Sequence, residues 1–447
     1  MADAAQRLTT LAEDLLATPL PVRIRAWDGS EAGPPGAPVL VIRSRRALRR
    51  LLWKPGELGL ARAWVAGEID FEGDLYEALD KLADLIWERE DDGGDTVHPV
   101  LDRRKRAAAR ALLRLGGPLP PPPPPPEELR RHTGRPHSKR RDKEAISHHY
   151  DVGNDFYSLV LGPSMVYSCA YFSDPTAPLE DAQHDKLDLI ARKLDLRPGQ
   201  RLLDVGCGWG SLALHAARTY GVRVTGVTLS TEQAAFARER IAGAGLTDRV
   251  EIRVQDYRDV LPQALGSARA GDAPFGPYDA IASVGMAEHV GAVQYGEYAA
   301  DLYALLKPGG RLLNHQIARR PVPDEETYQV DPFIDSYVFP DGELAPLGRT
   351  VGQLEQAGFE VRDVESIREH YALTLRHWVA NLEKNWDAAL RTVTPGRARV
   401  WRLYMAASAL SFEHNTIGVN QVLAVRPGPS GVSRMPLRTR VWNGRSE

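Results

Sequence analysis

The stretch Leu202-Leu-Asp-Val-Gly-Cys-Gly-Trp-Gly-Ser211 joins a short apolar run to a segment with helical spacing. The apolar start predicts a buried strand, which three alternating glycines follow. Glycine lets the backbone turn sharply and approach a ligand without a Cβ clash. The glycines form G-x-G-x-G after Asp204, whereas dinucleotide-binding enzymes use G-x-G-x-x-G. The stretch therefore predicts a strand-turn-helix unit with a ligand at the carboxyl end of the strand.

Short apolar runs alternate with helical stretches around this turn, which is typical of a doubly wound, mostly parallel α/β sheet. Strands are expected at 201–205, 222–227, 250–254, 278–284 and 310–314, and helices at 212–220 and 232–243. Ser230 is a suitable N-cap for the second of these helices.

Four parts are expected along the chain. They are a small α+β domain over 1–98, a basic and proline-rich linker over 99–144, the α/β domain over 145–427 and a frayed tail over 428–447. In the first part, 22–27 and 38–42 resemble strands and 75–87 has helical spacing. In the linker, 101–115 predicts a basic amphipathic helix, and the prolines at 120–126 favour an extended spacer.

Several classes of protein are disfavoured. Two cysteines, Cys169 and Cys207, cannot form a disulfide framework, so a reducing compartment is expected. The acidic start of the chain does not resemble a secretory signal. No run of about 18 apolar residues occurs, so no membrane span is expected. These features predict a cytoplasmic protein whose membrane contact, if any, is peripheral.

Basic residues are concentrated between His98 and Lys143, where 13 Lys/Arg stand against 4 Asp/Glu, while the whole chain has a net charge of −3. Such a stretch suits an anionic surface, either lipid headgroups or nucleic acid. A solvated linker is the other interpretation.

The glycine turn resembles motif I of class I S-adenosylmethionine-dependent methyltransferases. In that family the turn holds the methionine part of the cofactor, and the next two strand ends contact the ribose and the adenine. The cofactor residues that the resemblance implies are Tyr167, Ser168, Asp204, Gly206, Gly208, Gly210, Thr228, Leu229, Ser230, Gln233, Gln255, Asp256, Tyr257 and Val284.

Further motifs resemble the cyclopropane-fatty-acyl-phospholipid synthase family over roughly residues 145 to 426. They are His148-His-Tyr-Asp-Val-Gly-Asn-Asp-Phe-Tyr157, Tyr167-Ser-Cys-Ala-Tyr171, Gly285-Met-Ala-Glu-His-Val-Gly291, Leu313-Asn-His-Gln-Ile317, Tyr337-Val-Phe-Pro-Asp-Gly342 and His370-Tyr-Ala-Leu-Thr-Leu375. The N-terminal domain also has a counterpart in the phospholipid-acting bacterial members.

This resemblance implies transfer of a methyl group to the cis double bond of an unsaturated phospholipid acyl chain. The resulting carbocation loses a proton to a base, which closes a cyclopropane ring, and a bound bicarbonate is thought to be that base. The implied ligands of bicarbonate are the backbones of Cys169 and Ile317 and the side chains of Glu288, His315 and Tyr371. Tyr371 could also stabilise the cation.

Each of these residues also has an ordinary interpretation when taken alone. Cys169 could be a nucleophile, but no activating partner is visible, and a free cysteine is commonly a small buried apolar residue. Glu288 and His289 have neither the spacing nor the partners of a zinc site, so no metal is expected. His315 would be structural, and Tyr371 a half-buried aromatic. Their joint occurrence in matching motifs favours catalysis.

Three residues depart from the family pattern near the implied base site. Ala287 stands where many members have phenylalanine, and Gln316 and Ala318 flank Ile317 where threonine and glycine are common. A smaller Ala287 would loosen the pocket wall, and Gln316 could add a hydrogen bond. The product therefore stays open between a ring and, after a hydride shift, a methylene branch. A partner reductase would convert that branch into a 10-methyl fatty acid.

The substrate implied by the resemblance lies in a membrane. The segment from Arg103 to Lys143 and the N-terminal domain are expected to dock on the inner face of the cell membrane, with the enzyme as a homodimer. Two other functions are alternatives: a methyltransferase acting on RNA or a small metabolite, and a non-catalytic lipid- or cofactor-binding protein. The synthase-like motifs and the retained site residues argue against both, and no nucleic-acid partner is expected.

Overall fold

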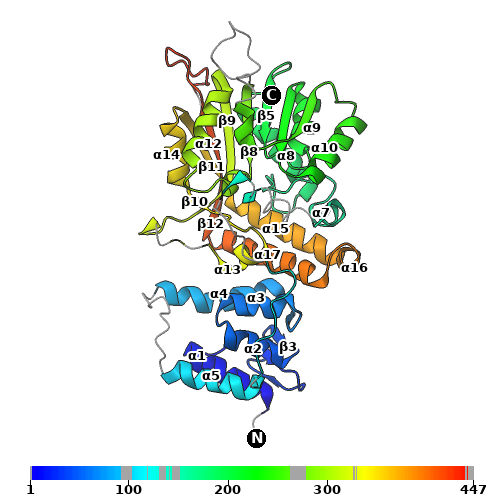
Figure 1. Cartoon of the computed structure of the whole chain (residues 1–447), viewed down its shortest axis with the longest axis vertical. Coiled ribbons are helices and arrows are strands. Elements are labelled where there is room, and N and C mark those ends of the chain that lie inside the picture. The colour runs from blue at the N-terminus through cyan, green and yellow to red at the C-terminus, as the bar shows by residue number, and fades with distance from the viewer. Residues whose placement is uncertain are drawn as a thin grey trace. The chain divides into compact units, whose positions relative to one another are not determined.

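The computed structural model describes residues 3–91, 103–117, 119–129, 137–139, 141–142, 152–261, 278–325, 328, 330–437 and 440. These residues form two compact units, whose elements are labelled in Figure 1. Unit 1 comprises Met1–Arg130, Asp331–Val338 and Val393–Leu410. Unit 2 comprises Arg131–Val330, Phe339–Thr392 and Ser411–Glu447.

Unit 1 contains a four-stranded sheet in the order β2-β1-β3-β4. Strands β1 and β3 are parallel, and β2 and β4 are antiparallel to their neighbours. The elements of unit 1 are α1 Ala4–Leu16, β1 Arg23–Arg25, β2 Glu31–Ala32, β3 Val39–Ile42, α2 Arg45–Trp53, α3 Glu57–Val65, β4 Ile69–Glu72, α4 Leu75–Asp91, α5 Arg103–Gly116, α13 Pro332–Tyr337 and most of α17 Pro395–Glu413. The expected α+β character and the basic helix are confirmed.

The proline-rich stretch is bonded into unit 1 and is not a free spacer. Arg50 donates a hydrogen bond to the carbonyl of Pro123 at 2.8 Å. Glu128, two residues after the stretch, accepts hydrogen bonds from Arg62 at 2.6 Å and from the hydroxyl of Tyr337 at 2.9 Å. Residues 103–129, which were expected to form a linker after a domain boundary at residue 98, therefore belong to unit 1. Residues 130–136 lie outside the described residues.

Part of the C-terminal half of the chain also belongs to unit 1. The indole of Trp64 in α3 donates to the carbonyl of Arg399 in α17 at 2.8 Å. In return, the Arg399 guanidinium donates to the carbonyls of Trp64 and Ile69, both at 2.6 Å, and to Asp70 at 3.1 Å. Unit 1 is thus built from segments far apart in sequence, which the expected four-part division did not include.

Unit 2 contains the large sheet, in the order β11-β12-β9-β8-β5-β6-β7, with the short β10 beside β9. Strands β9, β8, β5, β6 and β7 are parallel, and β12 is antiparallel to both β9 and β11. The elements are α7 Asn154–Leu161, α8 Leu179–Lys193, β5 Arg201–Val205, α9 Ser211–Tyr220, β6 Arg223–Thr228, α10 Thr231–Gly243, β7 Val250–Val254, η1 Tyr257–Asp259, β8 Tyr278–Val284, η2 Ala287–His289, α12 Tyr295–Leu305, β9 Leu306–Arg319, β10 Ala345–Pro346, α14 Leu347–Gln356, β11 Glu360–Ser366, α15 Arg368–Lys384, α16 Trp386–Ala389 and β12 Ile417–Val425. The expected doubly wound α/β fold is confirmed.

Both faces of this sheet are covered because its strands are apolar on both sides. Leu202 packs into a cluster with α8, α9 and α10, while the adjacent Leu203 packs into a second cluster with α12 and α14. Figure 1 shows these helices on opposite sides of the sheet. Burial on both faces is the usual reason why parallel strands are continuous apolar runs.

The residues after β12 are held on unit 2 as far as they are described. Met435 packs against the α8–α10 cluster, and Arg440 pairs with Asp363 at 3.1 Å. The expectation of a frayed tail is wrong for these residues, and 441–447 lie outside the described residues. Among the helices that the structure describes, none is both long and apolar enough to cross a bilayer.

Candidate active site

The glycine-rich turn follows β5 in the middle of the large sheet, between β8 and β6. Gly206, Gly208 and Gly210 have φ values of +76°, +52° and +78°, in the region that favours glycine. The backbone amides of Gly206 and Cys207 both donate to the carbonyl of Val227 at 3.0 Å, which fixes the turn against β6. The strand-turn-helix unit predicted from the sequence is therefore present.

Gly210 allows a direct test of this turn. A Cβ at Gly210 would lie 3.0 Å from the Cβ of Ala237, at a positive φ. We expect Gly210→Ala to lower the free energy of unfolding by about 1–2 kcal/mol and to weaken S-adenosylmethionine binding. Gly243→Ala is the matched control, because nothing lies within 4 Å of that Cβ at the end of α10. Equal unfolding temperatures and equal calorimetric affinities for the two variants would contradict the prediction.

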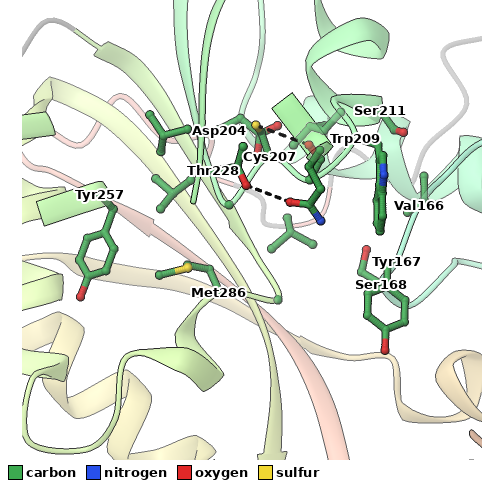
Figure 2. A pocket seen from close by; sticks show the side chains of 18 of the residues that line it. Val166, Tyr167, Ser168, Asp204, Cys207, Trp209, Ser211, Thr228, Tyr257 and Met286 are labelled. Carbon is green, nitrogen blue, oxygen red and sulfur yellow. Dashed lines mark hydrogen bonds between the residues drawn. The ribbon is translucent and has the colours of Figure 1, made fainter. Parts of the chain in front are cut away.

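The carboxyl ends of β5, β6 and β8 and the residues after β7 surround one pocket, together with residues 165–168 and α8 (Figure 2). The predicted cofactor residues that line it are Tyr167, Ser168, Asp204, Gly206, Gly208, Thr228, Leu229, Gln233, Gln255, Tyr257 and Val284. The hydroxyl of Thr228 lies 2.9 Å from the side-chain oxygen of Gln233, a contact drawn in Figure 2. Residues from separate parts of the chain thus converge on one site.

The other predicted cofactor residues support the wall of this pocket. Gly210 is the N-cap residue of α9. Ser230 caps α10 as predicted and accepts a hydrogen bond from the amide of Gln233 at 3.2 Å. Asp256 accepts from the Arg258 guanidinium, with the Nε–Oδ1 pair at 2.8 Å.

Two buried groups of opposite charge lie at the pocket. Asp204 is 2% exposed, and burial raises the pKa of its carboxyl to about 7, which the charge of Lys186 opposes. Lys186 is 1% exposed, and burial lowers the pKa of its ammonium to about 8. Its Nζ donates to the hydroxyl of Ser168 at 2.9 Å. Asp204 Oδ2 is buried without a hydrogen-bond partner among the described residues, so it is an acceptor available to a ligand.

Residues from well before the sheet also reach the pocket. Asp142 lines it and accepts a hydrogen bond from Arg258 at 2.9 Å. On the same stretch, Lys139 pairs with Asp259 at 2.5 Å, and Arg141 pairs with both carboxylate oxygens of Asp341. Two side chains of the basic segment are therefore neutralised within unit 2.

Glu288 and Ile317, two of the predicted bicarbonate ligands, are bonded to each other. The backbone amide of Ile317 in β9 donates to Glu288 Oε1 at 2.8 Å. Burial raises the pKa of Glu288 to about 7, although the hydrogen bond from Ile317 opposes this. Glu288 Oε2 has no partner among the described residues. Both residues line a small cavity separate from the cofactor pocket.

The side-chain amide of Gln316 is hydrogen-bonded to residues outside the implied base site. Its Oε1 accepts from the hydroxyl of Tyr295 at 2.8 Å and from the amide of Asn314 at 2.7 Å. Its Nε2 donates to Thr350 at 2.7 Å. Ala287 is buried among the apolar residues that pack with α12, so it does contribute to a wall beside Glu288.

His315 is two residues before Ile317, so both face the same side of β9. The ring is 1% exposed, and its Nδ1 lies 3.3 Å from the amide nitrogen of Gln421 in β12. Its Nε2 has no partner among the described residues. Burial, with the nearby charges of Lys186 and Lys193, lowers the pKa of the imidazole well below its ordinary value.

Cys169 and Tyr371 both lie at α15. The Cys169 thiol is fully buried, 3.6 Å from the carbonyl of Ile367, and burial raises its pKa well above the ordinary value. A thiolate nucleophile is therefore disfavoured, since nucleophilic cysteines have lowered pKa values. The next residue, Ala170, donates its amide to Thr374, one turn beyond Tyr371. The Tyr371 ring is 7% exposed and lies 4.6 Å from the ring of Phe412.

The implied base-site residues thus lie on β9, η2, α15 and the segment before α8; Cys169, His315 and Tyr371 are buried, and Glu288 and Ile317 are half-buried. Glu288 and Ile317 share a hydrogen bond. Cys169 and His315 both lie near Lys186, whose charge affects the pKa of each. No group of three or more metal-ligating side chains exists within the described part of the chain. The first four residues of the His148–Tyr157 motif lie outside it.

Sequence reasoning missed Lys186, Gln421 and Arg258. A signal existed for Lys186, because it shares the buried face of α8 with Leu179, Ala182 and Ile190. A lysine at core spacing on a helix is rare unless it has a partner. Gln421 and Arg258 carried no comparable signal, because their partners are distant in sequence.

A parallel sheet with an added antiparallel strand, and a glycine-lined pocket at the carboxyl ends of its strands, define a class I methyltransferase. A family model described as mycolic acid cyclopropane synthetase matches residues 137–422. The chain belongs to this family, and it is a methyltransferase.

Related proteins include a "probable fatty acid methyltransferase" of Mycobacterium tuberculosis, 44% identical over 94% of each chain. A cyclopropane-fatty-acyl-phospholipid synthase of Escherichia coli is 38% identical over 66% of this chain and 71% of that protein. Among solved structures, the mycolic acid cyclopropane synthase CmaA1 in complex with SAH and CTAB has a TM-score of 0.56 and 31% identity, and the match covers 63% of this chain and 97% of that one.

Proposed function

We propose that this enzyme transfers the methyl group of S-adenosylmethionine to the cis double bond of an unsaturated phospholipid acyl chain, with cyclopropane formation as the outcome. The observation that carries the proposal is a pair of buried polar atoms without partners among the described residues, Glu288 Oε2 and His315 Nε2. Buried polar groups are almost always hydrogen-bonded, so each of these atoms is available to a ligand. The names of the relatives support a lipid acyl chain as the acceptor.

The residues of the pocket fit S-adenosylmethionine. A Cβ at Gly206 would lie 3.4 Å from Met286, so glycine keeps this wall open. Asp204 offers an unpartnered carboxylate oxygen toward the ammonium of the methionine part, and Lys186 with Ser168 offers donors toward its carboxylate. Tyr257 and Gln255 line the side where the resemblance puts the adenine. When bound, S-adenosylmethionine supplies an electrophilic methyl group.

The base-site residues fit a small oxyanion such as bicarbonate. The Ile317 amide donates to Glu288 Oε1 and so orients this carboxyl group, whose other oxygen has no partner among the described residues. A carboxyl group with a pKa of about 7 can carry a proton near neutral pH and donate it to an anion. Bicarbonate held by Glu288, His315 and Tyr371 would supply the base that removes the proton.

Side chains of unit 2 would also stabilise the positive charge that develops on the acyl chain. The rings of Tyr371, Phe412 and Trp378 form a cluster with centroids 4.6 Å and 6.1 Å apart. Tyr167, which lines the cofactor pocket, continues this cluster, with its ring 5.3 Å from that of Trp378. Aromatic faces attract cations, and burial of the cluster excludes the water that would capture a carbocation.

A methylene branch is the second candidate product. Ala287 lies beside Glu288 where the resemblance implies a larger residue, and a relative that matches over 94% of the chain is named for methylation rather than ring formation. A carbocation with more room can undergo a hydride shift before it loses a proton. A partner reductase would then be required to give a methyl-branched chain.

The function is tested by incubating the purified enzyme with S-adenosylmethionine and vesicles of oleoyl phospholipid. We expect the acyl chains to gain the mass of one methylene group, and NMR then separates a ring from a branch. Stearoyl vesicles, which lack the double bond, are the matched control. Methylation of RNA in place of lipid, or no transfer to any oleoyl chain, would overturn the proposal.

Docking on an anionic membrane is proposed for α5 in unit 1. Arg110 and Arg114 are exposed there, and Leu113 between them is 42% exposed. The side chains of Arg103, Arg104 and Arg106 lie outside the described residues. Basic residues near an anionic surface contribute about 1 kcal/mol each. We expect Arg110→Gln/Arg114→Gln to weaken binding to phosphatidylglycerol vesicles by about 30-fold in a sedimentation assay.

The control for this prediction is Arg197→Gln/Arg223→Gln, which removes two exposed charges from unit 2. Wild-type binding should weaken as salt is added. Salt-independent binding, or an equal loss in both double variants, would argue against docking through α5.

A further inference from the structure

A buried row of polar side chains lies behind His315. Lys193 in α8, which is fully buried, donates from its Nζ to Gln421 Oε1 at 2.7 Å. The Nε2 of the same amide lies 3.3 Å from His315 Nδ1. Lys193 also donates to Glu365 in β11, which supplies the counter-charge. The row therefore runs from an ion pair, through one amide, to the imidazole.

The donors and acceptors along this row leave one arrangement. A lysine ammonium can only donate, so the oxygen of the Gln421 amide must face Lys193. The amide nitrogen then faces His315 and can only donate in its turn. His315 Nδ1 must therefore be an unprotonated acceptor. In a neutral imidazole the proton is then on Nε2, the atom without a partner among the described residues.

We infer that Lys193 and Gln421 are positioning residues that hold His315 as the neutral Nε2–H tautomer, so that it presents a fixed hydrogen-bond donor to the oxyanion at the base site. Neither residue is placed at the reacting atoms. This assignment rests on the proposed function for the identity of the ligand, whereas the tautomer itself does not depend on any ligand.

The charges around the ring agree with a neutral imidazole. Lys186 and Lys193 both lie close enough to disfavour a second proton on His315. The negative charge of Glu365 offsets the positive charge of Lys193. Lys186 interacts electrostatically with the thiol of Cys169 and the carboxyl of Asp204. Protonation of His315 Nδ1 would also make its N–H face the N–H of the Gln421 amide, so that two hydrogen-bond donors would point at each other. His315 is thus an anion-holding donor, and it cannot serve as the base without loss of the Gln421 hydrogen bond.

The tautomer can be measured directly in the full-length protein without cofactor or lipid. Nitrogen-15 NMR of labelled histidine rings separates protonated from unprotonated ring nitrogens, and the His315→Asn variant identifies the His315 signals. We expect wild-type His315 to carry its proton on Nε2. In Gln421→Glu, a carboxylate would replace the donor, and we expect the proton to move to Nδ1 or the ring to become doubly protonated. Wild-type His315 with its proton on Nδ1 would overturn the inference, whether or not the Gln421 variants fold.

A kinetic readout separates positioning from simple packing. Gln421→Glu should lower kcat by about 10- to 100-fold while the affinity for S-adenosylmethionine stays unchanged. Gln421→Met keeps the volume but removes the donor, and it should lower kcat less than Gln421→Glu because it imposes no wrong tautomer. An unchanged tautomer in folded Gln421→Glu would overturn the role of Gln421. A correct tautomer without lipid methylation would contradict only the proposed function.

Discussion

The Glu288→Ala variant is expected to transfer methyl groups about 100- to 1,000-fold more slowly than the wild type, because it removes the carboxyl group placed at the base site. Its affinity for S-adenosylmethionine should stay within about twofold, since Glu288 lines a cavity separate from the cofactor pocket. Steady-state kinetics and calorimetric titration of the cofactor test the two parts separately. Full turnover in this variant would remove Glu288 from the mechanism.

The isosteric variant Glu288→Gln should separate activity from stability. It keeps the acceptor for the Ile317 amide and keeps a donor for an anion, so its activity should lie between those of the wild type and Glu288→Ala. Its stability should exceed that of the wild type at alkaline pH. The folded-state pKa of Glu288 is raised from 4.5 to about 7. The wild type therefore loses stability as pH rises from 4.5 to about 7, because the unfolded state releases the proton in this range while the folded state keeps it.

The expected gain for Glu288→Gln is up to about 3 kcal/mol above pH 7 and vanishes toward pH 4.5. Chemical denaturation at about pH 5 and about pH 8 measures it. The control is Glu369→Gln, which removes one carboxylate from a side chain that is 70% exposed. A gap of the opposite sign would show that the ionised carboxylate is stabilised by partners other than Ile317.

The Lys186→Met variant is expected to bind S-adenosylmethionine about 10- to 100-fold more weakly at neutral pH. The change removes the donor to Ser168 and a cation that lowers the pKa of Asp204. The pKa of Asp204 should therefore rise above about 7, so that its carboxyl becomes protonated in the neutral range. Affinity should then recover as pH rises, because Asp204 ionises again.

Calorimetric titration of the cofactor across this pH range tests the prediction. Lys384→Met, at the exposed end of α15, is the matched control for loss of one lysine. Circular dichroism of both variants establishes that they are folded. A Kd for Lys186→Met equal to that of the control at every pH would assign Lys186 to packing alone.

The central strands of the large sheet could be predicted from the sequence because each of them is a short apolar run that is visible in the local sequence. The runs at 201–205, 250–254 and 278–284 are strands over those same residues. The position of β12 could not be predicted in this way. Its apolar pattern indicates burial, but only long-range pairing decides that it lies between β9 and β11.

Prediction of the site residues has the same limit, because local patterns do not reveal long-range contacts. Glycines with positive φ are needed by the turn itself, so Gly206 and Gly208 could be assigned from a local pattern. The role of Gln421 depends on Lys193 and His315, which are 228 and 106 residues away in sequence. No local pattern in a single sequence reports such an arrangement. The use of Gln316 by Tyr295, Asn314 and Thr350 could not be predicted for the same reason.

Unit 1 is formed by segments that are far apart in the sequence, and this affects how the chain can fold during synthesis. Its first 130 residues leave the ribosome long before Arg399, whose guanidinium bonds the carbonyls of Trp64 and Ile69. The N-terminal portion must therefore wait, partly assembled, until nearly all of the polypeptide has been synthesised. A protein shortened to begin at residue 137 would lack Trp64 and Ile69, whose carbonyls accept hydrogen bonds from Arg399 of α17.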